Sequence, residues 1–159
     1  MRVTKSFSNI FHQHNRVFAL IAVFSVTLLT AAYVSAAQVT DRSVQLSSSS
    51  KAATGVSYKV NFTPVSSAGA FVVDFCSDSP VIGETCAAPG GFSATSAAST
   101  TSGFTDVSAL DANTIVVTGS MTGSTPVSVD VTGITNPSAS GPLYARIISY
   151  DTDTNADSY

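Results

Sequence analysis

Residues 55–65, GVSYKVNFTPV, decide the fold class of this chain. Apolar and polar side chains alternate through the stretch, which puts Val56, Tyr58, Val60 and Phe62 on one face. A period of two residues is typical of a β-strand with one buried face. Pro64 lacks a backbone donor and ends the pattern. The stretch therefore predicts a half-buried antiparallel strand.

Similar short segments follow along the chain at intervals near ten residues, separated by Gly, Pro, Asn and Ser. Strands are expected near residues 44–46 and at 69–76, 113–119, 126–134 and 143–150, with a weak strand within 92–103 and an ambiguous segment at 104–110. Residues 143–150 carry bulky side chains on both faces, which favours a central strand covered on both sides. This pattern predicts an all-β fold, an antiparallel β-sandwich of immunoglobulin-like type after an N-terminal apolar helix.

The apolar helix is expected in the segment VFALIAVFSVTLLTAAYVSAA, residues 17–37. Basic residues precede it, an uncharged run of about 27 Å in helical form covers residues 17–34, and small residues follow. Cleavage of a signal after Val34-Ser35-Ala36 or after Ser35-Ala36-Ala37 is one interpretation; an uncleaved anchor through residues 17–34 and a buried core helix are the alternatives. With either the signal or the anchor the rest of the chain crosses the membrane. The expected organisation is a signal or anchor at 1–37, a strand or spacer at 38–55 and the sandwich at 56–159, or from near residue 40.

The predicted exported part of the chain, after residue 37, has 122 residues, enough for one domain with a core. Its composition excludes several classes of function. Four basic residues stand against ten acidic ones, a net charge near −6. Such a surface disfavours nucleic acid as a partner. Both histidines precede the apolar segment, so the exported part has no His-based triad and no His-ligated zinc. A hydrolase that uses only carboxylates is the remaining enzymatic alternative, and the short, Trp-free chain disfavours it.

The two cysteines, Cys76 and Cys86, both lie in the predicted exported part, ten residues apart. In an oxidising compartment this pair indicates one disulfide, with an expected contribution of about 2.5–3 kcal/mol from loop closure. Between Cys76 and Gly91 the chain is rich in Ser, Asp, Pro and Gly, so a loop closed by the disulfide is expected rather than a strand or helix. The loop either serves as a binding surface or only closes a long connection.

The acidic segment at 151–157 is the one candidate metal site in the sequence. Ligand types alternate along it, as in calcium loops: Asp151, Asp153, Asn155, Asp157. Ala156 replaces the usual Gly at the sixth position, and the bidentate Glu at the twelfth position is missing because the sequence has no residue there. Calcium is thus the only cofactor the sequence suggests, and a solvated acidic turn is the alternative.

Four segments resemble exported Thr/Ser-rich β-domain surface proteins of small-genome bacteria: DRSVQLSSS at 41–49, YKVNFT at 58–63, VVDFCSDSPVIGETCAAPGGF at 72–92 and TNPSASGPLYARIISY at 135–150. The resemblance implies export, the disulfide loop and a β domain, and it carries over no activity and no site residues. Together these patterns predict a secreted or membrane-tethered, non-catalytic component of the cell envelope. Its partner would be the envelope or another surface protein. The alternative is a glycan- or protein-binding module that uses the Cys76–Cys86 loop, with or without calcium.

Overall fold

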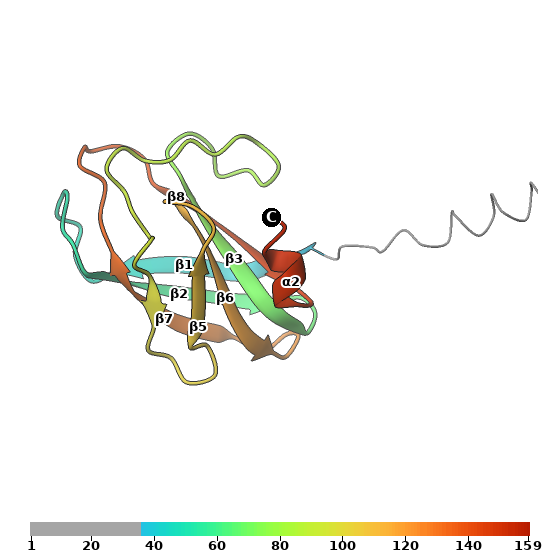
Figure 1. Ribbon diagram of the computed structural model, residues 1–159. Helices are drawn as coiled ribbons and strands as arrows, with labels where there is room; N and C mark the ends of the chain where they lie inside the picture. Colours follow the sequence, from blue (N-terminus) through green and yellow to red (C-terminus); the bar gives the residue numbers. More distant parts are fainter. Residues whose placement is uncertain (1–35) are drawn as a thin grey trace, which may run out of the picture. The chain divides into compact units, whose positions relative to one another are not determined.

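A computed structural model describes residues 36–159. The predicted apolar helix, and the signal or anchor at 17–34, lie outside the described residues. Eight antiparallel strands and one helical turn make up this part of the chain: β1 Ala36–Leu46, β2 Val56–Pro64, β3 Ala68–Cys76, β4 Ala98–Ser99, β5 Asp106–Ala109, β6 Thr114–Met121, β7 Val127–Ile134, β8 Tyr144–Tyr150 and α2 Asp153–Ala156. The prediction of an antiparallel all-β fold is confirmed, and Figure 1 shows the arrangement.

The strands form one sheet in the order β4-β7-β2-β1-β8-β3-β6-β5. Strand β1 joins two halves, because residues 36–38 pair with β8 and residues 39–46 pair with β2. An extra residue of β1 lies between Thr40 and Ser43, where Asp41 has a positive φ of 49°. Such a bulge bends a strand and increases its twist. The sheet curls so that its edge strands β4 and β5 approach each other. The sequence predicted two packed sheets, whereas a single continuous sheet passes through β1.

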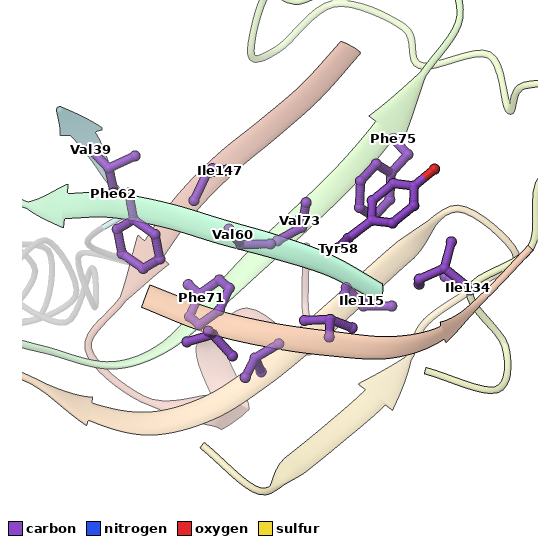
Figure 2. Close-up of a cluster of buried hydrophobic side chains, with 14 of the residues drawn as sticks. Val39, Tyr58, Val60, Phe62, Phe71, Val73, Phe75, Ile115, Ile134 and Ile147 are labelled. Carbon is purple, nitrogen blue, oxygen red and sulfur yellow. The ribbon is translucent and has the colours of Figure 1, made fainter. Parts of the chain in front are cut away.

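The inner faces of the two halves pack against each other and form the main core. Strand β2 alternates between buried and half-buried residues along its whole length, as its sequence predicts. The aromatic rings meet across the core, with 5.5 Å between the ring centroids of Tyr58 and Phe75 and 4.9 Å between those of Phe62 and Phe71. Figure 2 shows these side chains between the two layers. Aromatic edge-to-face pairs stabilise such cores beyond their buried area.

The outer face of β3, β6 and β8 is covered as well. Ala156 of α2 is fully buried against a second apolar cluster that includes Val72, Val116 and Ile148. Strand β8 therefore contributes buried residues to both faces, with Ile147 in the main core and Ile148 in the outer cluster. The prediction of a central strand covered on both sides is confirmed.

Two elements differ from their predicted extent. Strand β1 begins at Ala36, within the segment predicted as a leader, and is much longer than the pattern around Val44 and Leu46 indicates. Residues 92–103 hold only the two-residue strand β4, and the ambiguous segment 104–110 holds β5.

Strand β7 includes Gly133 with a φ of +81°, where one extra residue interrupts the pairing with β2. An added Cβ there would overlap the Ser96 carbonyl oxygen, so this bulge requires glycine.

Candidate functional site: the disulfide loop and the buried Asp74–Arg146 pair

A buried charged pair lies on the outer face of the sheet, beside the cysteines. Asp74 of β3 stands directly opposite Arg146 of β8 on one side and Thr114 of β6 on the other. Asp74 and Arg146 are both 2% exposed. Ionised side chains are rarely buried to this extent unless they are paired and hydrogen-bonded. The register of three neighbouring strands thus sets the position of this site.

The Asp74 carboxylate accepts hydrogen bonds at both oxygens. Its Oδ1 accepts from Thr114 Oγ1 at 3.0 Å and from Asn113 Nδ2 at 3.4 Å. Its Oδ2 accepts from the Tyr159 hydroxyl at 2.9 Å and lies 3.5 Å from Arg146 Nη1. The charge is therefore compensated from four side chains. Burial raises the pKa of Tyr159 to about 12, and its hydrogen bond to the Asp74 carboxylate adds to the rise.

Arg146 fastens the disulfide loop to the sheet. Its Nε and Nη2 donate to the Ser79 carbonyl oxygen at 3.1 and 2.9 Å. Its Nη1 donates to the Glu84 carbonyl at 2.9 Å, and its Nη2 donates to the Thr85 carbonyl at 2.7 Å. A guanidinium group offers five donors in a rigid fork, which suits several acceptors at once. One buried side chain thus holds both sides of the loop.

The predicted disulfide between Cys76 and Cys86 is confirmed, with 4.9 Å between the two Cα atoms. The loop has no strand or helix between these cysteines, as predicted. Two hydrogen bonds, from Ser77 N to the Ala87 carbonyl and from Ala87 N to Asp78 Oδ1, close its base at 2.9 and 3.0 Å. The bond from the Ala87 N–H lowers the pKa of the Asp78 carboxyl group.

A pocket of about 290 Å³ opens between this loop, the turn before β6 and Tyr159. Glu84 and Asp111 line it together with the Asp74–Arg146 pair. The Asp111 carboxylate orders the turn, because its Oδ1 accepts from the N–H groups of Asn113 and Thr114 at 2.8 and 2.7 Å. Three carboxylates, those of Asp74, Glu84 and Asp111, line this pocket with one guanidinium, so its net negative charge suits a ligand with cationic or hydroxyl groups.

The predicted calcium ligands lie around α2, at the end of β8. Asp151 Oδ1 accepts from Asn155 Nδ2 at 2.6 Å, and Asp153 Oδ1 accepts from Thr154 N at 2.7 Å. Thr152 caps the helical turn. Among residues 36–159, three carboxylate or cysteine ligand atoms come together at Asp74, Cys76 and Cys86, and not at Asp151, Asp153 and Asp157. The two sulfur atoms are bonded to each other and are not thiolate ligands. Calcium binding by the segment 151–157 stays a prediction.

A second buried polar centre holds the loop between β1 and β2. Asn136 is 2% exposed; its Oδ1 accepts from the Tyr58 hydroxyl at 2.8 Å, and its Nδ2 donates to the carbonyls of Ser48 and Ser50. Burial raises the pKa of Tyr58 to about 12. The four-serine run at 47–50 is therefore attached to the domain at both of these carbonyls.

Sequence reasoning located the disulfide and missed the charged pair. A signal for the pair was present: Asp74 interrupts the apolar strand FVVDFC, and Arg146 interrupts LYARIISY, which was itself expected to be covered on both faces. Charged residues in strands buried on both faces need partners. Which partner each residue takes depends on the strand order and register, and these are properties of the folded sheet.

Comparisons with protein families, curated proteins and solved structures find no match for this chain. Within residues 36–159, no helix has the length and apolar character needed to cross a membrane. The function is therefore inferred from the chain's own residues and their geometry.

Proposed function

We propose that this chain is an exported, non-catalytic protein of the cell envelope with a structural or adhesive role. The observation that carries the proposal is the loop closed by the disulfide and fastened by Arg146. Disulfides persist in oxidising compartments, which supports export. The immunoglobulin-like packing of the two halves of the sheet belongs to the same proposal. So does the place of the domain at the cell surface, either tethered or released.

The loop has the properties of a contact surface. Its base is rigid, whereas Val81 at its tip is 55% exposed. A loop that is already ordered loses little conformational freedom when it binds, which favours association. Rigid loops on a β scaffold often carry recognition. The expected partner is another surface protein or a component of the envelope.

The buried polar groups support a role without catalysis. Within residues 36–159, every buried side-chain nitrogen or oxygen has a hydrogen-bond partner. The Asp74 carboxylate, for example, is saturated by Thr114, Asn113, Tyr159 and Arg146. A general base needs an accessible lone pair within reach of a substrate proton. A saturated carboxylate of this kind is suited to holding a structure together.

The proposal is tested by an exposed substitution at the loop tip, Val81→Asp. Because Val81 is not part of the core, the substitution should leave the melting temperature unchanged. Self-association, or adhesion to isolated envelopes, should fall severalfold. The matched control is Val65→Asp, at a 61% exposed valine in the turn between β2 and β3, at the opposite end of β3. Equal association by the wild type and both variants would overturn the role of the loop.

A second candidate function is a glycan- or protein-binding module, and the pocket of about 290 Å³ beside the loop favours it. Its test is equilibrium binding of a panel of soluble glycans to the wild type and to Asp111→Asn, with Asp106→Asn on the neighbouring strand β5 as the control. Saturable binding that only Asp111→Asn weakens would support this function. A rise in melting temperature with calcium, lost in Asp153→Asn, would add the calcium dependence predicted for residues 151–157.

A further inference from the structure

The first residues of β1 occupy the position predicted for signal-peptidase cleavage. Ala36 pairs with Tyr150, Ala37 with Ser149 and Gln38 with Ile148, and these three pairs are the whole register between β1 and β8. The remaining part of β1 pairs with β2. The two halves of the sheet are therefore joined through three residues at the start of β1.

Ser149 provides an independent link to this segment. It is 1% exposed, and its Oγ donates to the Ala37 carbonyl oxygen at 3.2 Å. Ser149 stands opposite Phe71 on β3, whose ring is in the main core. A buried hydroxyl that loses its partner destabilises the folded state, because it was stripped of water without compensation. The core thus contains a polar group whose acceptor is the backbone of Ala37.

We infer that Ala36 and Ala37 stay in the folded protein as the first residues of β1, so that neither predicted small-residue site is cut. The inference rests on the proposed export and concerns its processing step. Cleavage after Ala37 would remove two of the three pairs with β8 and the acceptor of Ser149. Cleavage after Ala36 would remove the pair with Tyr150. Either cut would expose backbone groups along the edge of β8.

The retention of Ala36 and Ala37 bears on how the domain would be tethered to the membrane. The apolar run ends at Val34 and β1 begins at Ala36, so a single residue separates them in the sequence. Strand β1 pairs with β8 through residues 36–38 and with β2 through residues 39–46. A tether of this kind would enter the domain at the three residues that pair β1 with β8.

The test is the N-terminus of the full chain, recovered from the membrane and surface fractions of cells that express it, by intact mass and N-terminal peptide mapping. A chain that begins at Ala36 or at any earlier residue supports the inference. A chain that begins at Ala37 or Gln38 overturns it. Labelling of intact cells with a membrane-impermeant amine reagent in the same experiment tests export separately. An unlabelled chain would overturn the proposed function, whatever its N-terminus.

A substitution at Ser149 gives a second, independent readout on the same full chain. With Ala37 in place, Ser149→Ala removes a satisfied hydrogen bond and should lower the melting temperature by a few degrees. In a chain that starts at Gln38 the hydroxyl has no Ala37 acceptor to lose, so the same substitution should leave the melting temperature unchanged or raise it. The control is Ser128→Ala at an exposed position of β7, which should leave the melting temperature unchanged. An unchanged or higher melting temperature in Ser149→Ala would overturn the inference.

Discussion

At the scale of single residues, Asp74 and Arg146 depend on each other far more than the exposed ion pair of the same sheet. Lys59 Nζ lies 3.8 Å from Asp130 Oδ2, and both side chains are 44% exposed. Water screens such a pair, and it contributes about 1 kcal/mol or less. The side chains of the Asp74–Arg146 pair are only 3% and 1% exposed, so removal of either partner leaves a buried charge without compensation.

Asp74→Asn should therefore reduce the free energy of unfolding by about 3–5 kcal/mol, because the Arg146 charge stays buried. The matched control, Asp130→Asn, should cost about 1 kcal/mol or less. Urea denaturation followed by circular dichroism measures both values. Similar losses in the two variants would contradict the role assigned to Asp74.

The buried Tyr58 hydroxyl makes stability sensitive to high pH. Burial raises its pKa to about 12 in the folded state, above the ordinary value of 10.0. Between these values the folded state binds more protons than the unfolded state, so stability is full below pH 10 and falls as pH rises toward 12.

Tyr58→Phe should reduce this fall, although Tyr159, with a pKa of about 12, retains part of it. The measurement is the free energy of unfolding at a series of alkaline pH values. An identical alkaline slope in Tyr58→Phe and the wild type would contradict the assignment.

At the scale of elements, the loop at 76–86 is held by a covalent link and by Arg146 together. The disulfide limits the unfolded chain, whereas the guanidinium bonds to Ser79, Glu84 and Thr85 order the folded loop. The two links are therefore expected to have different effects when they are removed.

Replacement of both cysteines by alanine should cost about 2.5–3 kcal/mol of unfolding free energy and leave the loop docked on the sheet. Amide hydrogen exchange should show that the Ala87 N–H, which donates to Asp78, keeps most of its protection under native conditions. Arg146→Met, the comparison variant, should lose protection throughout the loop. A fully exchanging loop in the cysteine-free variant would contradict the role of Arg146.

At the scale of the whole molecule, periodicity predicted the strands better than it predicted how they assemble. The alternation in β2 and the apolar character of β3 and β8 fix which faces are buried, because burial follows side-chain type. The continuity of the sheet through β1 was not predictable, since it depends on the bulge at Asp41 and on pairing with β8, more than one hundred residues further along the chain. The charged pair was missed for the same reason: register determines it.

We propose that the protein presents an oxidised, Arg146-anchored loop at the outer surface of the cell. The most direct test labels intact cells with a membrane-impermeant amine reagent, recovers the chain, and measures its mass and free thiols before and after reduction. We expect modification at Lys51 and Lys59, none at Lys5, and thiols that react only after reduction. Modification that requires cell lysis, or free thiols at Cys76 and Cys86 in the recovered chain, would contradict the account.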